Sequence, residues 1–210
     1  MIMFRKNLAG LLALAAAASA PNAAAQIDLP DHAVTAGKEV DDSSAANYAD
    51  PIQITADLSS RMLTVRQGGN TLKTYQVAVG TPRYPTPPGN YTIRKMIWNP
   101  SWRPPPGSAW ARGKTAKGPG EPGNPMRVVK IFFREPDYYI HGTDAVESLG
   151  SAASHGCLRM DPDDVADLAR LIMDHGGQPR SENWFMRILH SRREEQIVYL
   201  DNPVSLTVQN

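Results

Sequence analysis

Residues 99–125 limit the possible folds more than any other segment, because this stretch is rich in proline and glycine. Proline removes a backbone donor and interrupts helices and central strands, so the segment cannot continue a sheet or a helix. A chain without regular pairing runs over the surface, where water satisfies its polar groups. Loops of this length are typically lids, binding loops or disordered segments. The regular structure must therefore be formed by the residues before and after it.

Tryptophans and basic side chains are combined in and next to this loop: Trp98 stands directly before it, and Trp102, Trp110, Arg103, Arg112, Lys114 and Lys117 lie within it. Such residues can stack on nucleic-acid bases, form one wall of a cleft for a peptide or a sugar, or lie on the body as a solvated loop. Nucleic acid is the least favoured partner, because the whole chain has a formal charge of only +1. The cleft wall and the solvated loop stay open, with Trp110 as a candidate substrate contact.

Short β-type runs flank the loop on both sides. Alternating or continuous apolar patterns predict strands at 52–54, 62–65, 71–79, 90–96, 128–133, 138–140, 198–200 and 204–208. The last two are separated by Asp201-Asn202-Pro203. A helix is predicted to begin at Pro162, with Asp161 as its N-cap, and to stop at Gly176-Gly177. A second helix is expected over 183–189, so the sequence predicts a mostly β domain with one or two helices.

The N-terminus has the pattern of an export signal. Arg5 and Lys6 precede an apolar run that is too short to span a membrane, and small residues follow with possible cleavage after Ala20 or Ala25. We therefore expect a signal peptide over 1–25, a flexible spacer over 26–50 and a folded domain over 51–208. Removing Arg5 and Lys6 takes the formal charge from +1 to −1. A nearly neutral chain without another long apolar run gives no reason to expect nucleic acid or a membrane span.

The chain has a single cysteine, Cys157, in the tetrapeptide Ser154-His155-Gly156-Cys157. In an exported protein it is either an inert buried thiol or a nucleophile, because one cysteine cannot form an internal disulfide. A nucleophilic thiol needs a base, and imidazole is the commonest one.

Of the five histidines, His141 follows a predicted strand and is the candidate base, whereas His155 in the tight turn is assigned a positioning role. His32 lies in the spacer, and His175 and His190 are expected at the surface or as helix caps. Gly156 allows close approach of a substrate, and the amides around His155, Gly156 and Cys157 are candidates for an oxyanion hole.

Two blocks resemble the signature of the L,D-transpeptidase catalytic domain. The first comprises Ile140-His141-Gly142-Thr143 and Ser154-His155-Gly156-Cys157-Leu158-Arg159-Met160, and the second comprises Val79-Gly80-Thr81 and Thr86-Pro87-Pro88-Gly89-Asn90-Tyr91. The resemblance implies a β-sandwich-like fold with a cradle-shaped active site. It also implies that Cys157 is the nucleophile, that His141 accepts and donates the proton, and that the Gly142 carbonyl orients the imidazole.

The family acts on peptidoglycan stem peptides, so the resemblance implies release of a terminal D-alanine and a cross-link between third residues. The acceptor is a second stem peptide, water or a lipoprotein lysine, and the location is the periplasm or cell envelope. Ser154 is a further positioning residue. Thr143 and Arg159 are candidate substrate contacts, and Arg159 pairs either with a substrate carboxylate or with Asp161 or Asp163. No cofactor is expected, and no oligomeric state is indicated.

Two other readings remain. His141, His155 and Cys157 could ligate zinc with Asp144 as a fourth ligand, although this spacing is not a usual zinc pattern, so no metal is expected. The domain could instead be a catalytically silent module that binds the cell wall through the tryptophan-rich loop.

Overall fold

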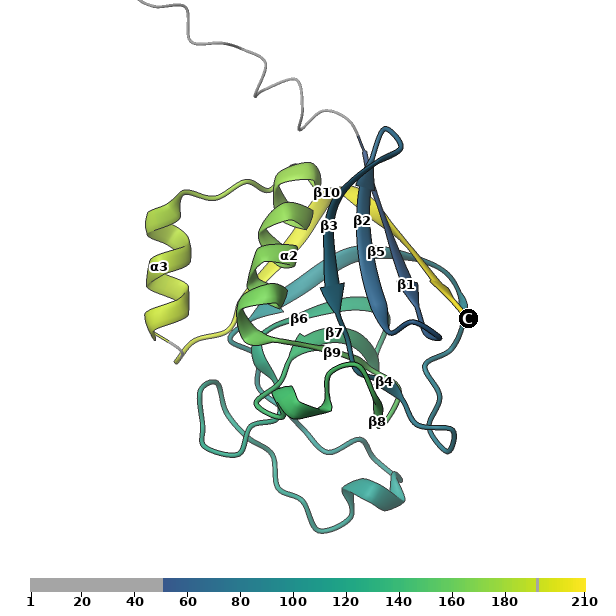
Figure 1. Ribbon diagram of the computed structural model, residues 1–210. Coiled ribbons are helices and arrows are strands. Elements are labelled where there is room, and N and C mark those ends of the chain that lie inside the picture. Colours follow the sequence, from purple (N-terminus) through teal and green to yellow (C-terminus); the bar gives the residue numbers. More distant parts are fainter. Residues whose placement is uncertain (1–50, 192) are drawn as a thin grey trace, which may run out of the picture. The chain divides into compact units, whose positions relative to one another are not determined.

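The computed structural model describes residues 51–191 and 193–210 (Figure 1). The expected signal peptide and spacer lie outside these residues. The predicted mostly β class with helices is confirmed: most of the regular structure is strand, accompanied by two α-helices.

Eight strands form one curved, barrel-like sheet (Figure 1). Their order across the sheet is β3 (Asn70–Gln76), β2 (Met62–Gln67), β1 (Ile52–Asp57), β10 (Gln196–Gln209), β5 (Gly89–Trp98), β6 (Arg127–Arg134), β7 (Tyr138–Gly142) and β9 (Leu158–Met160). Neighbours are antiparallel except for the parallel pairs β1 with β10 and β7 with β9. A second, two-stranded sheet pairs β4 (Val79–Gly80) with β8 (Ala152–Ser154). The β7–β9 pair carries the predicted reactive residues.

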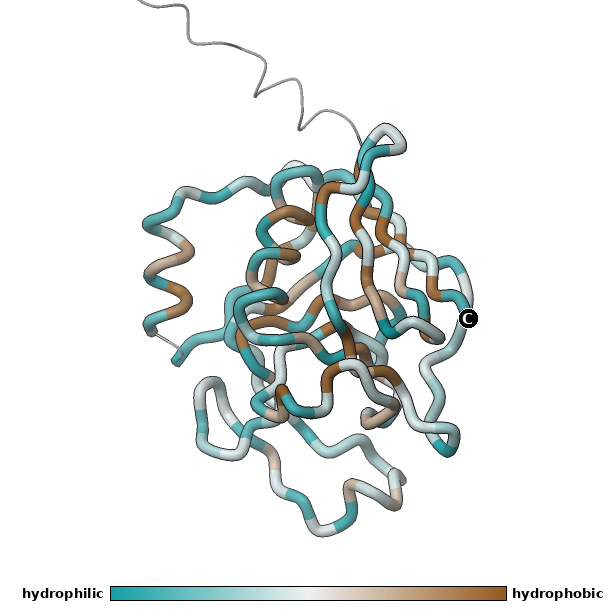
Figure 2. Tube along the Cα trace, in the orientation of Figure 1, coloured by the Kyte–Doolittle hydropathy of each residue, from teal (hydrophilic) through white to brown (hydrophobic). Residues whose placement is uncertain are grey.

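One face of the sheet packs against helix α2 (Pro162–His175), and apolar residues gather between them in Figure 2. The alternation in β1 buries Ile52, Ile54 and Ala56 on this face, as a period of two requires. Each large apolar side chain buried in this way contributes about 1.5–3 kcal/mol. Helix α3 (Glu182–Ser191) adds Phe185, whose ring lies 5.5 Å from that of Trp98.

Helix α2 begins and ends where the sequence predicts. The Asp161 carboxylate accepts a hydrogen bond from the Asp163 amide at 2.8 Å, and Pro162 occupies the first turn. The helix ends at Gly176, and Gly177 follows with a φ of +78°. His175 lies at the end of α2, as one of the two expected alternatives requires, but it is buried and not at the surface. His190 is exposed, and its Nδ1 lies 2.6 Å from the Met186 carbonyl oxygen.

Two predicted strand boundaries differ from the structure. The strand expected over 71–79 ends at Gln76 as β3. Beyond it the chain no longer pairs with β2, because Ala78 exchanges hydrogen bonds with Arg159 instead. The two closing strands are one strand, β10, which runs through Asp201-Asn202-Pro203 with a register shift against β5. The Asn202 amide donates to the Gly176 carbonyl instead of to β5. A bulge therefore accommodates residues that normally signal a turn.

The proline-rich loop, residues 99–125, contains one short 3₁₀ turn, η1 (Ala109–Ala111), and an isolated bridge between Trp102 and Lys117. Trp102 is buried against Met126 and Tyr139, which is the packing expected of a tryptophan that anchors a loop to the body. A second short turn, η2 (Val146–Ser148), follows β7.

Within the described residues, neither helix has the length and apolar character needed to cross a bilayer.

Candidate active site

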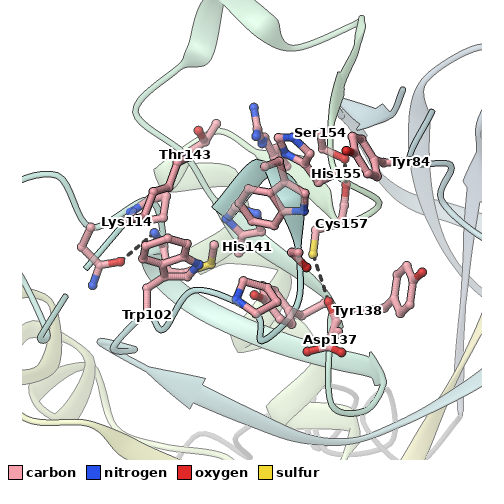
Figure 3. Close-up of a pocket in the computed structure, with 18 of the residues that line it drawn as sticks. Tyr84, Trp102, Lys114, Asp137, Tyr138, His141, Thr143, Ser154, His155 and Cys157 are labelled. Carbon is pink, nitrogen blue, oxygen red and sulfur yellow. Dashed lines mark hydrogen bonds between the residues drawn. The ribbon is translucent and has the colours of Figure 1, made fainter. Parts of the chain in front are cut away.

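The ends of β7 and β9 bring His141 and Cys157 to the same cavity. In the parallel pair, Ile140 lies opposite Leu158 and His141 lies opposite Arg159, so Cys157 stands directly before the first paired residue of β9. Both side chains line a cavity of about 690 Å³ whose other wall is the loop 99–125 (Figure 3). This volume is typical of a site for a small molecule or peptide segment.

His141 is held in one tautomer. Its Nδ1 lies 2.8 Å from the Gly142 carbonyl oxygen. A carbonyl only accepts, so Nδ1 carries the hydrogen and the neutral ring keeps a free lone pair on Nε2. Burial, together with the charges of Arg159 and Lys130, lowers the pKa of His141 to about 3, against the opposing effect of the hydrogen bond to Gly142. The imidazole is therefore a neutral base at ordinary pH.

The position next to His141 has no room for a side chain and is occupied by Gly142. A Cβ atom at this position would lie 2.7 Å from the Arg127 carbonyl oxygen and 3.1 Å from the Val165 side chain. The lack of a side chain lets β7 approach both β6 and helix α2.

Cys157 is a thiol in the resting protein. Its Sγ donates to the Asp137 carbonyl at 3.4 Å. Burial raises the pKa of Cys157 to about 11, although the Tyr139 amide and the charges of Arg159 and Lys130 favour the thiolate. With the pKa of His141 lowered and that of Cys157 raised, both side chains are neutral near pH 7.

The turn before Cys157 is braced by Ser154. The buried Ser154 hydroxyl donates to the Cys157 carbonyl at 2.5 Å and accepts from the Gly156 amide at 3.0 Å. Gly156 has a φ of +110°, and a Cβ atom there would lie 2.9 Å from the Tyr138 ring. These contacts fix the direction of the Cys157 side chain.

The Gly156 amide, one of the three considered for an oxyanion hole, donates to the Ser154 hydroxyl inside the turn. In the described part of the chain, the amides of His155 and Cys157 have no protein acceptor. They remain the candidates for an oxyanion hole.

His155 lies in an aromatic stack at the mouth of the cavity (Figure 3). Its ring stacks on Trp110 at 4.1 Å with an interplanar angle of 18°, and Tyr84 lies 4.9 Å away. The Lys114 ammonium lies 5.1 Å from the Trp110 ring on the loop side. Trp110 thus links the loop 99–125 to the turn that carries Cys157.

Residues of the second motif, Val79-Gly80-Thr81 and Thr86 to Tyr91, form hydrogen bonds to and around the turn that carries Cys157. The Thr81 amide donates to the Ser154 carbonyl at 3.0 Å, and the buried Thr86 hydroxyl accepts from the Gly80 amide at 2.9 Å. The segment 80–89 therefore buttresses the turn and supplies Tyr84. Tyr84 could not be identified from the sequence, because its partner His155 lies far along the chain.

Arg159 is half-buried and lines the cavity. Within the described residues it forms no ion pair with a carboxylate, and Asp161 caps helix α2 instead. Thr143 is buried, and its hydroxyl accepts from the Ala145 amide at 3.2 Å at the edge of the same cavity. The structural partners considered for Arg159 are therefore not used, and its charge stays available to a ligand.

Three further residues of the site were missed by the sequence analysis: Lys130, Asp137 and Tyr139. The Tyr139 ring lies 5.6 Å from the His141 ring, and Lys130 Nζ lies 5.0 Å from the Tyr139 ring. Lys130 also donates to the Ser101 carbonyl at 2.7 Å, at the start of the loop. The period of two in β7 places Tyr139 and His141 on one face, and this signal could have identified Tyr139.

The described residues contain no group of three or more His, Cys, Asp or Glu side chains placed to hold a metal ion.

Comparisons with known proteins agree with this geometry. Residues 51–180 match the family model described as L,D-transpeptidase catalytic domain. Two Bacillus subtilis proteins named as L,D-transpeptidases are similar to the chain. YkuD is 29% identical over 60% of this chain and 63% of its own length, and YqjB is 34% identical over 47% and 53%. The chain thus spans less than two thirds of either relative.

A solved structure with a similar fold is L,D-transpeptidase 3 from Mycobacterium tuberculosis, with a TM-score of 0.50 and 16% identity. The match covers 77% of this chain and 62% of that chain. At this identity the likeness concerns the fold alone.

Proposed function

Because the chain belongs to the family of L,D-transpeptidase catalytic domains, we propose that it cross-links peptidoglycan stem peptides through a thioester on Cys157. One observation carries the proposal: the chain's single cysteine and a histidine with a free Nε2 line the same cavity. A thiol beside an oriented imidazole is the arrangement that nucleophilic acyl transfer needs.

The first step is acylation by the tetrapeptide stem. Sγ of Cys157 attacks the carbonyl carbon of the third residue while His141 Nε2 takes the thiol proton. The developing oxyanion is stabilised by the amide of Cys157, with that of His155 as a second donor. The bond to the terminal D-alanine then breaks, and the leaving amine takes the proton from His141. Arg159 binds a carboxylate of the stem, and Trp110 and Thr143 border the bound peptide.

The second step transfers the acyl group to an acceptor. The amine of a second stem peptide gives a cross-link between third residues. Water would give carboxypeptidase activity, and a lipoprotein lysine would give anchoring. In each case the thiol is regenerated with a proton from His141.

The proposed substrate is part of the cell wall, so we also propose that residues 1–25 direct export and that the enzyme acts in the periplasm or cell envelope. The basic start, the short apolar run and the small residues near Ala20 and Ala25 support this location.

The competing function is a silent wall-binding module. Labelling of Cys157 by iodoacetamide at mildly acidic pH does not separate the two, because a raised thiol pKa makes that labelling slow in both cases. A covalent acyl-enzyme does separate them, since only the transpeptidase forms one.

The test is incubation of the purified protein with disaccharide tetrapeptides, followed by mass spectrometry of the protein and the products. We expect a mass increase on Cys157, release of D-alanine and appearance of a dimer, all absent in Cys157→Ala. Equal product from Cys157→Ala, or no acyl-enzyme in the wild type, would overturn the assignment.

A further inference from the structure

The carboxylates around the cavity differ in whether a cation already neutralises them. Asp144 pairs with Arg127 at 2.5 Å, and Glu135 pairs with Lys95 at 2.6 Å. Asp137 follows Glu135 by two residues, is exposed, and forms no ion pair with any described residue. Of the two carboxylates that line the cavity, Asp137 is therefore the one with a free charge.

Asp137 also lies directly beside the nucleophile. Its backbone carbonyl accepts the hydrogen bond from Cys157 Sγ at 3.4 Å. Its negative charge disfavours the thiolate and so contributes to the raised pKa of Cys157. In Figure 3, Asp137 and Tyr138 lie on one side of the sulfur, and Ser154 and His155 lie on the other.

The charges around the cysteine therefore have opposite signs. Arg159 is half-buried and unpaired among the described residues, and Lys114 lies over Trp110 at the mouth. These cations suit the carboxylates of an acyl donor. An amine acceptor arrives as an ammonium ion, and Asp137 is the complementary group next to the acylated sulfur.

We propose that Asp137 binds the primary ammonium group of the acceptor and favours transfer to an amine over transfer to water. The inference rests on the proposed transpeptidase function and names its acceptor class. Asp137 is a binding residue, because a carboxylate beside an ammonium ion keeps that ion protonated and does not activate it.

The transfer step moves two protons from the acceptor nitrogen and exchanges the carbon–sulfur bond for a carbon–nitrogen bond. The bound ammonium loses one proton to solvent, and its nitrogen attacks the thioester carbon. A second proton passes from that nitrogen to His141 Nε2 as the carbon–sulfur bond breaks. The Cys157 thiolate takes this proton from His141, which leaves a new amide, a neutral thiol and a neutral imidazole.

The expected effect is modest, because Asp137 is exposed and ion pairs in water are weak. Removing the charge of such an exposed pair is expected to change acceptor binding by about 1.4- to fivefold. A plain solvated carboxylate would give no change.

The experiment uses the full chain with a disaccharide tetrapeptide as donor and a disaccharide tripeptide, which lacks the leaving D-alanine, as acceptor. The ratio of cross-linked to hydrolysed product is measured against acceptor concentration for wild type, Asp137→Asn, Asp137→Glu and Glu135→Gln. This ratio is independent of the acylation rate, because both products come from the same thioester.

We expect Asp137→Asn to raise the acceptor KM and lower the product ratio by about 1.4- to fivefold, and Asp137→Glu to restore most of the loss. Glu135→Gln removes a charge from the same turn but leaves the ratio unchanged. Added salt lowers the wild-type ratio toward that of Asp137→Asn.

An unchanged ratio in Asp137→Asn, or an equal change in Glu135→Gln, would overturn the inference while leaving the transpeptidase function intact. Absence of any acyl-enzyme in the wild type would overturn the proposed function, and the inference with it.

Discussion

The strand pair β7–β9 and the loop 99–125 face each other across one cavity but are held by different forces. The strands carry His141 and Cys157 beside residues such as Ile140 and Leu158, which are fully buried and lie opposite each other in the ladder. The loop is fixed by a few contacts, chiefly the Trp102–Lys117 bridge, the Asn124 side chain and the Trp110–His155 stack.

This difference in how the two regions are held suggests a division of roles: the strand pair positions the proposed reactive groups, and the loop controls entry of peptides. Backbone ladders with buried side chains open only with much of the domain, whereas a loop with few buried contacts opens at low cost. The positions of the proposed reactive groups should therefore resist changes in the loop, and the loop should govern how peptides enter. Each prediction below tests this division.

The largest effect is expected from His141→Gln, which keeps a polar side chain but removes the base. We expect acylation to slow by about 10²- to 10⁴-fold, because the imidazole proposed to take the thiol proton is lost. The measurement is the rate of acyl-enzyme formation by mass spectrometry. His190→Gln, on the exposed side of α3, is the matched control and should acylate normally. Loss of less than tenfold in His141→Gln would show that the strand pair does not carry the base.

A smaller effect is expected from Asn124→Ala, which removes the main polar anchor of the loop. The buried Asn124 amide donates to the Pro100 and Gly118 carbonyls at 2.9 Å, and its oxygen accepts from the Met126 amide at 2.9 Å. Leaving such groups unpaired costs about 1–3 kcal/mol.

We expect faster hydrogen exchange in the loop of Asn124→Ala and unchanged exchange in β7 and β9. Asn90→Ala, which removes an exposed amide from β5, is the control and should affect neither region. Equal loosening of the strands would refute the separation between the two regions.

A still smaller effect is expected from Trp110→Ala. Stacked aromatic pairs contribute about 0.5–1.5 kcal/mol beyond the area they bury. We expect weaker protection of the Ala111 and Arg112 amides, which bond back to Ser108 and Ala109, and a higher KM for the donor with a nearly normal turnover. Trp110→Phe should recover part of the loss. A large fall in turnover with KM unchanged would instead place Trp110 in the chemical step.

The smallest effect concerns the pH dependence of kcat/KM, which we expect to be flat near neutrality. An ordinary histidine would lose half its base form at pH 6.5, but burial lowers the pKa of His141 to about 3. We therefore expect kcat/KM to stay level from neutral pH through pH 6.5. A half-maximal value near 6.5 would show that the imidazole is solvated.

Stability should depend on pH between 6.5 and about 3. The unfolded chain binds a proton on His141 near pH 6.5, and the folded chain does so only near pH 3. The free energy of unfolding should therefore fall as the pH drops from 6.5 toward 3. Denaturant unfolding of wild type and His141→Gln measures this contribution, and the variant should have the shallower slope.

Sequence reasoning found the local parts of the site and missed those that depend on distant partners. Helix α2 was predictable because Asp161, Pro162 and Gly176 act within a few residues of one another. The continuity of β10 was not, because the Asn202 amide is satisfied by Gly176 on another element. The same limit hid Tyr84, Lys130 and Asp137, whose partners lie far along the chain.

The sequence by itself singled out Cys157 and His141 as the proposed reactive pair, since a lone cysteine and a strand-end histidine are chemically distinctive wherever they lie. It also determined the family and the mostly β class, through short motifs and alternation. Only the tertiary structure decided that thiol and imidazole rest neutral, because burial depends on what surrounds them. It likewise decided that the Gly156 amide donates its hydrogen bond to Ser154 and that the His155 ring stacks on Trp110 of the proline-rich loop. Asp137, whose carbonyl accepts from the sulfur, forms no ion pair with a described residue. Those properties come from contacts that residue type and spacing do not encode.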